Sequence, residues 1–127
     1  MSIQIQKIGI IGVGTMGAGI AAQVANAGIP VLLLDIVRDP DDRNAVAAGA
    51  VAKMLKTDPA PFMSKAAAKL VETGNIEDDL AKIASQEMGK LIEQSRGEVK
   101  LCAQIARYYA DNAKQFLAPV KYPSELG

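Results

Sequence analysis

A glycine motif near the start of the chain constrains its fold more than any other feature. Residues 8–17 read Ile-Gly-Ile-Ile-Gly-Val-Gly-Thr-Met-Gly. The apolar run that opens the motif is typical of a buried parallel strand. Gly12 permits a tight turn, Gly14 lets the backbone approach a pyrophosphate, and Gly17 lets the following helix lie close to the strand. The motif therefore predicts a strand, a turn and a helix whose N-terminus binds a phosphate group.

The sequence that follows the motif supports this interpretation. Apolar residues recur at helical spacing at Met16, Ile20, Val24 and Ala27. Gly28 is placed to end that helix in a left-handed conformation. A second apolar run, residues 29–35, ends in Asp35, roughly 20 residues after the motif, where an acidic side chain can meet the adenosine ribose. The structural alternative is that the three glycines only form a tight turn.

Asp35 also bears on the choice of ligand. A carboxylate at this position accepts hydrogen bonds from the ribose hydroxyls and repels a 2′-phosphate, which favours NAD over NADP. Arg38 leaves that preference open, because a guanidinium can accommodate the phosphate. ADP, ATP and AMP are alternative ligands of the same phosphate site. The candidate cofactor-binding residues are Gly12, Val13, Gly14, Thr15, Met16, Gly17, Asp35 and Ile36.

Composition excludes several other classes of function. The 14 basic and 14 acidic residues cancel, so no overall field favours nucleic acid or an anionic membrane. Histidine is absent from the 127 residues, which removes the commonest general base and a frequent metal ligand. No apolar run reaches the roughly 20 residues that span a bilayer, and we expect no secretory signal. The single cysteine, Cys102, cannot form an internal disulfide, so the cytoplasm is the expected compartment.

The middle of the chain predicts further helices and a third strand. Residues 39–42 read Asp-Pro-Asp-Asp, typical of a helix start, and a helix is expected to continue over residues 45–56. A short helix over 62–68, a strand over 70–73 and a helix capped by Asn75 should follow. The predicted fold class is α/β, a truncated Rossmann-like half with about three parallel strands in the order 3-2-1, followed by a long C-terminal helix or helical hairpin.

Residues from about 5 to 84 closely resemble the NAD-binding domain of the 3-hydroxyacyl-CoA dehydrogenase family, in its bacterial fatty-oxidation type. The resemblance depends on the motif and its extension Ala18-Gly19-Ile20, on residues 31–35, and on the later landmark Gly-Asn-Ile-Glu-Asp-Asp-Leu at 74–80. It implies a Rossmann fold that binds NAD. In that family a fourth strand should follow at once, and this chain departs from the pattern there.

From about residue 87 to 127 the chain is instead similar to the N-terminal helical region of aldehyde dehydrogenases, nearest to the succinate-semialdehyde type. The residues that carry this likeness are Glu87-Met88-Gly89-Lys90, Arg96-Gly97-Glu98-Val99, Tyr108-Tyr109-Ala110 and Phe116-Leu117-Ala118-Pro119. Two families that meet near residues 84–86 suggest a chimera, whether engineered, selected from fragments or produced by rearrangement. We therefore divide the chain into a dinucleotide-binding half, 1–84, and a helical segment, 85–127, that packs on it or on another subunit.

Neither resemblance brings catalytic residues into this chain. The hydroxyacyl family uses a histidine activated by a glutamate, and the aldehyde family a cysteine with an acidic partner, all beyond the matching segments. The acidic groups at 41–42, 77–79 and Glu98 are interpreted as helix-end or solvent-facing charges. We expect a non-catalytic protein that binds nucleotide or dinucleotide. The alternatives are a purely structural homo-oligomer and a residual NAD-dependent oxidoreductase with an unassigned base.

The last part of the sequence predicts assembly with further copies. Gly89-Lys90 should interrupt the helix that follows Asn75, and residues 91–117 read as one long helix. Its apolar stripe is expected to be core or interface, with Cys102 as a buried and inert thiol: Ile92, Val99, Cys102, Ala103, Ala106, Tyr109, Ala113 and Phe116. The first strand would lack its usual partner, strand four, on its free edge. Either the long helix covers that edge or a homodimer or homotetramer forms.

Overall fold

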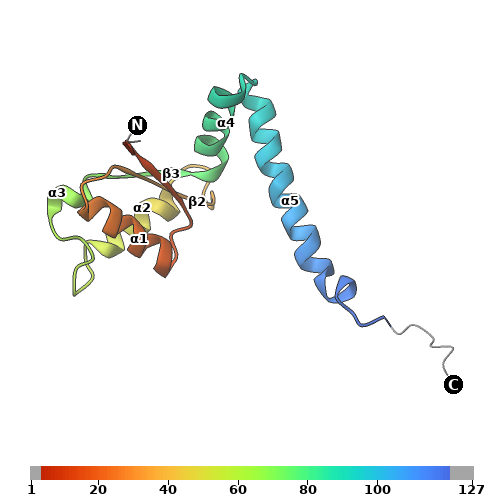
Figure 1. The fold of residues 1–127 in the computed structure, drawn as a ribbon, viewed down its shortest axis with the longest axis horizontal. Helices are drawn as coiled ribbons and strands as arrows, with labels where there is room; N and C mark the ends of the chain where they lie inside the picture. The colour runs from red at the N-terminus through yellow and green to blue at the C-terminus, as the bar shows by residue number, and fades with distance from the viewer. Residues whose placement is uncertain (1–3, 121–127) are drawn as a thin grey trace.

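The structure is a computed structural model that describes residues 4–120, so the outer ends of the two predicted segments, 1–3 and 121–127, lie outside the described residues. Three parallel strands form one sheet in the order β1-β2-β3: β1 (Ile8–Ile11), β2 (Val31–Asp35) and β3 (Val71–Asn75). The connections contain α1 (Thr15–Asn26), α2 (Ala45–Met54) and the short α3 (Lys65–Ala68). A turn of π-helix, η1 (Ile76–Leu80), leads into α4 (Ala81–Met88) and the long α5 (Ile92–Phe116). Figure 1 shows this truncated Rossmann-like half with its long C-terminal helix, which confirms the predicted fold class.

The hydrophobic core lies on one face of the sheet. Ile10 pairs with Leu33, and Val31 pairs with Val71, so apolar side chains from all three strands point to the same side. Helices α1 to α3 cover this side, and Met54 and Phe62 complete the core. The opposite face carries an ion pair between Lys7 and Glu72, which reaches across the central strand. The sheet therefore has one packed face and one more polar face.

Helix α1 packs through alanines, and not through the larger apolar residues that made its periodicity visible. Ala21, Ala22 and Ala25 are buried, whereas Met16 and Ile20 are exposed. The helix lies so close to the sheet that only small side chains fit between them. At its C-terminus, Gly28 has φ +82°, and the N–H of Ile29 bonds to the carbonyl of Val24 at 3.3 Å. This is the left-handed ending predicted for Gly28.

The predicted cap of the second helix is wrong. Helix α2 begins at Ala45, after Asn44, and no side chain caps it. The carboxylate of Asp39 instead accepts the N–H of Asp41 at 2.9 Å, because an aspartate can bond to its own backbone two residues later and so compete with a helix start. The predicted cap at Asn75 is confirmed: its side-chain oxygen accepts the N–H of Asp78 at 2.8 Å.

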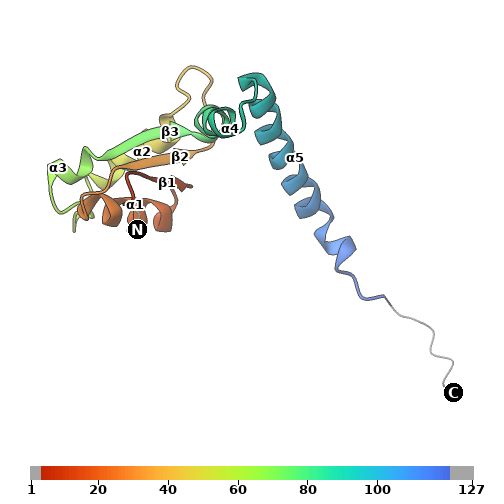
Figure 2. The same ribbon diagram turned by 45° about the horizontal axis from the view of Figure 1, so that its top comes forward.

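Helix α5 leads away from the sheet. Gly89, with φ +65°, separates it from α4 as predicted, and Figures 1 and 2 show α5 extending away from the strands. Its main contacts are with α4 and η1. Ser95 is its only buried residue, and Cys102 is exposed, so the prediction that the stripe and the thiol lie in the chain's own core is wrong. The alternative, that the stripe forms an interface, stays a prediction. A sheet of three short strands is too small to cover a helix of 25 residues.

Candidate nucleotide-binding site

The glycine loop joins the carboxyl end of β1 to the start of α1. Gly12 has φ +96°, and its N–H donates to the carbonyl oxygen of Leu34 at 2.7 Å, which ties the turn to β2. A Cβ atom on Gly17 would lie 1.8 Å from the carbonyl oxygen of Gly12, so this position has no room for a side chain. A Cβ on Gly14 would meet no atom within 4 Å. The loop is thus closed against α1 at Gly17 and open at Gly14, where a ligand could approach the backbone.

The N-terminus of α1 suits an anion. No side chain caps this helix of 12 residues, and its first turn contains no acidic residue. Its first N–H groups therefore have no side-chain partner, and the positive end of the helix dipole is not neutralised locally. Thr15 and Met16 form this first turn and are exposed to solvent. A phosphate beside Gly14 would meet these N–H groups.

The carboxylate of Asp35 holds the loop to the end of β2. Its Oδ2 accepts the N–H of Val13 at 2.7 Å, and its Oδ1 accepts the N–H of Ile36 at 2.7 Å. The structure thus brings together all eight candidate residues. The sequence does not predict the bond to Val13, because this bond depends on where the carboxyl ends of β1 and β2 lie relative to each other. A carboxylate has about four acceptor positions, so Asp35 retains capacity for ribose hydroxyl groups. Arg38 is exposed and forms no ion pair with a residue in the range 4–120.

A groove of about 850 Å³ lies between the segment after β2 and helix α5. Ile36 and Val37 form part of one side, together with Ile76, Leu80 and Ala84. The other side comes from α5: Ser95, Glu98, Val99, Lys100, Cys102, Ala103, Gln104 and Arg107. No sequence pattern predicts this groove, because its shape depends on the angle between α5 and the sheet.

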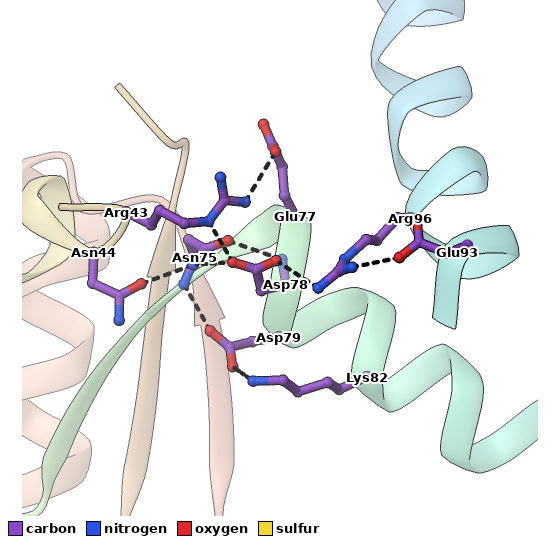
Figure 3. A network of polar contacts seen from close by, with 9 residues as sticks. All are labelled: Arg43, Asn44, Asn75, Glu77, Asp78, Asp79, Lys82, Glu93 and Arg96. Atoms are coloured by element: carbon purple, nitrogen blue, oxygen red, sulfur yellow. Dashed lines mark hydrogen bonds and ion pairs between the residues drawn. The ribbon is translucent and has the colours of Figure 1, made fainter. Parts of the chain in front are cut away.

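A network of polar contacts fixes that angle at the carboxyl end of the sheet (Figure 3). Arg43, before α2, donates to Asp78 at 2.6 Å and to Glu77 at 3.2 Å. Arg96 of α5 forms ion pairs with Asp78 at 3.4 Å and with Glu93 at 2.7 Å. The network therefore joins the β2–α2 connection, η1 and α5.

Asp78 is the centre of this network. It lies in the first turn of η1, so residue 78 is a helix-end charge, one of the two predicted alternatives. Its side chain is only 19% exposed, so the other alternative, a solvent-facing charge, is wrong. The hydrogen bond from Arg43 lowers the pKa of Asp78 below its ordinary value, although partial burial opposes the shift. The same bond raises the pKa of Arg43. A carboxylate with a lowered pKa is a weak base, so Asp78 is suited to holding the structure together and not to proton abstraction.

Asp79 has a different structural task. Its Oδ2 accepts the N–H of Asn75 at 2.8 Å, at the end of β3. A Cβ on Gly74 would lie 2.2 Å from that Asp79 oxygen, so the glycine leaves room for the carboxylate.

Among residues 4–120, no group of three or more His, Cys, Asp or Glu side chains could hold a metal ion. In the same residues, no helix is long and apolar enough to cross a membrane.

Known proteins are similar to this chain in sequence. The family model described as 3-hydroxyacyl-CoA dehydrogenase, NAD binding domain, matches residues 7–115. The protein named "Probable 3-hydroxyacyl-CoA dehydrogenase" of Deinococcus radiodurans is 57% identical over 82 residues, which cover 64% of this chain and 24% of that protein. The protein of the same name from Bacillus subtilis is 40% identical over 100 residues, covering 65% of this chain and 12% of that protein.

A second group of similar proteins is named as succinate-semialdehyde dehydrogenases. "Succinate-semialdehyde dehydrogenase [NADP(+)]" of Deinococcus radiodurans is 38% identical over 71 residues, which cover 56% of this chain and 14% of that protein. Because the matches to the two groups cover 64% and 56% of the chain, they share part of it. They therefore define no boundary at residue 84. The chain spans less than a quarter of the length of each of these three relatives.

The family match begins just before β1 and extends to the end of α5, so it includes the glycine loop, Asp35 and the whole sheet. The resemblance of residues 5–84 is thereby confirmed. This chain belongs to the family of 3-hydroxyacyl-CoA dehydrogenase NAD-binding domains.

Proposed function

We propose that this chain binds NAD mainly through the ADP half of the cofactor. The observation that carries the proposal is the shape of the glycine loop, which is closed at Gly17 and open at Gly14 beside an uncapped helix N-terminus. The pyrophosphate would lie against α1, and the ribose would bond to Asp35. The same contacts would accept ADP, ATP or AMP, because all four ligands share an adenosine phosphate.

We further propose that these 127 residues bind the cofactor without transferring a hydride. The chain contains no histidine, and the pKa of Asp78, whose side chain is 19% exposed, is lowered and not raised toward neutrality. A residual oxidoreductase is the competing hypothesis. Spectrophotometric assay with NAD and a 3-hydroxyacyl-CoA distinguishes the two, since any reduction of NAD that depends on the protein would contradict our proposal.

Calorimetry tests the binding itself. We expect measurable heat with NAD and with ADP, and little discrimination between them. Absence of heat with NAD, ADP and ATP at millimolar concentration would defeat the proposal. Gly14→Leu fills the open side of the loop, so it should abolish binding while the protein stays folded. If the chain is instead a purely structural oligomer, the wild type has no binding to lose, and Gly14→Leu tests only whether the fold tolerates a side chain there.

A homodimer or homotetramer is part of the proposal. Ile11 at the outer edge of β1 is 61% exposed, and no strand within residues 4–120 pairs with that edge. Tyr108, Tyr109 and Phe116 form an exposed cluster on α5, with ring centroids 5.5 to 6.1 Å apart. A second copy could cover both surfaces.

The chimeric origin remains a separate proposal. It is supported by the break at Gly89, by the departure of α5 from the sheet and by the match to succinate-semialdehyde dehydrogenases. Sequencing the gene in its genomic context would contradict the chimeric origin if an uninterrupted natural reading frame had relatives of the same architecture.

A cytoplasmic location is also proposed, because the single exposed cysteine forms no internal disulfide.

A further inference from the structure

The groove beside α5 begins where the proposed phosphate and ribose contacts end. Ile36 and Val37 line the groove and directly follow Asp35 in the chain. Asp35 is itself bonded to the glycine loop through the N–H of Val13. A ligand with its phosphates at the loop and its ribose at Asp35 would therefore have its third part, the base, next to the groove.

The chemistry of the groove suits a flat and weakly polar ring. Each of its two walls contains an apolar part, with Ile36, Val37 and Leu80 on the sheet side and Val99 and Ala103 on α5. Polar side chains also line the groove, among them Gln104, Lys100 and Arg107. The groove also contains two carboxylates, but Glu77 is paired with Arg43 and Glu98 with Lys90. Lys100 and Arg107 form no ion pair with any residue from 4 to 120, so these two unpaired positive charges favour an anionic ligand over a neutral nucleoside.

We infer that α5 provides the second wall of an adenine site. The adenine ring of a nucleotide bound at the glycine loop lies between Ile36 and Val37 on one side and Val99 and Ala103 on the other. The ion pair between Arg96 and Asp78 holds this wall in place, because it joins α5 to η1 one turn before Val99. This inference rests on the proposed function, and it adds the part of the protein that distinguishes an adenine nucleotide from phosphate alone.

Cys102 provides a direct test. It is the only cysteine of the chain, it is exposed, and it lines the groove. Its reaction with Ellman's reagent should slow about tenfold when ADP is present at ten times its Kd, because only the unoccupied fraction reacts. Inorganic pyrophosphate binds the loop without a base, so it should raise the melting temperature and leave the rate of thiol reaction unchanged.

A pair of substitutions tests the same wall without the thiol. Ala103→Trp fills the groove, whereas Ala110→Trp adds the same bulk to an exposed position of α5 outside it. Ala103→Trp should weaken ADP binding by at least about tenfold while the response to pyrophosphate persists, which shows that the variant is folded. Ala110→Trp should bind ADP as the wild type does.

The outcomes separate this inference from the proposed function. If ADP raises the melting temperature but does not slow the reaction of Cys102, the base lies elsewhere, and the inference is overturned while phosphate binding stands. The same holds if Ala103→Trp binds ADP normally. If neither ADP nor pyrophosphate changes the melting temperature, both the inference and the proposed function are overturned.

Discussion

Gly17 and Gly14 offer a matched pair of substitutions that separates folding from binding within one motif. A Cβ at Gly17 would lie 1.8 Å from the carbonyl oxygen and 2.9 Å from the carbonyl carbon of Gly12, and neither backbone atom can rotate away. A Cβ at Gly14 would meet nothing within 4 Å, and its φ of −59° is ordinary for any residue. We therefore predict that Gly17→Ala destabilises the protein and that Gly14→Ala does not.

The size of the effect follows from these distances. For Gly17→Ala, the contact of 1.8 Å must open to about 3.4 Å, where ordinary van der Waals contact begins, so α1 has to move away from β1. Overpacking of a core costs about 1–3 kcal/mol, and a clash with backbone belongs at the upper end. A loss of about 3 kcal/mol should lower the Tm by roughly 10–15 °C in a chain of this size. Gly14→Ala should change the free energy of unfolding by less than about 1 kcal/mol, chiefly through the unfolded chain.

Urea unfolding followed by circular dichroism measures both variants, and calorimetry with ADP measures their binding. Gly14→Ala should unfold like the wild type and bind ADP more weakly, because its methyl group occupies the open side of the loop. Equal stability of Gly17→Ala and Gly14→Ala would refute the reasoning, since it would mean that the close approach of α1 to Gly12 is not required by the fold.

Three further predictions concern charge and assembly. Asp35→Asn replaces a carboxylate that accepts two backbone N–H groups, so it should cost about 1–2 kcal/mol in urea unfolding and reduce any preference for NAD over NADP in calorimetry. Asp78 has a pKa below its ordinary 3.8 in the folded protein, so it stabilises the fold above that pH, and this contribution is lost as the pH falls through the folded pKa. The urea midpoint of Asp78→Asn should accordingly be lower than that of the wild type at pH 7 and converge with it in acid; a constant difference would contradict this. Light scattering should give a dimer or tetramer that Ile11→Lys, at the β1 edge, shifts toward monomer, and a clean wild-type monomer at high concentration would count against assembly.

The first βαβ unit was predictable because its determinants are local. Gly12 requires a positive φ and Gly17 a close approach of backbone, both of which the glycine spacing indicates directly. Asp35 lies at a spacing set by the lengths of α1 and β2. The residues that α1 buries were not predictable in the same way. Its largest apolar side chains, such as Met16, are exposed, because the approach that Gly17 permits leaves room only for alanine.

The position of α5 depends on contacts that are distant in sequence. Arg43 and Asp78 are 35 residues apart, and Asp78 and Arg96 are 18 apart, so no local pattern predicts that they meet. The predicted Asp39 cap failed for a different and local reason, because the same carboxylate bonds to the N–H of Asp41 two residues later. Local rules therefore accounted for the strands and the glycine loop, and not for the groove that α5 completes.

The two ends of α5 are consequently held to different degrees. Its 25 residues span about 38 Å, whereas the ion pair that joins it to η1, between Arg96 and Asp78, lies near its first turn. Partly exposed ion pairs contribute little individually, so they fix the nearby part of the helix better than its far end. Val99 and Ala103 lie close to that attachment, where a small ligand can find a preformed wall. Tyr109 and Phe116 lie beyond it, where an apolar cluster is more readily covered by a second copy than by the chain's own sheet.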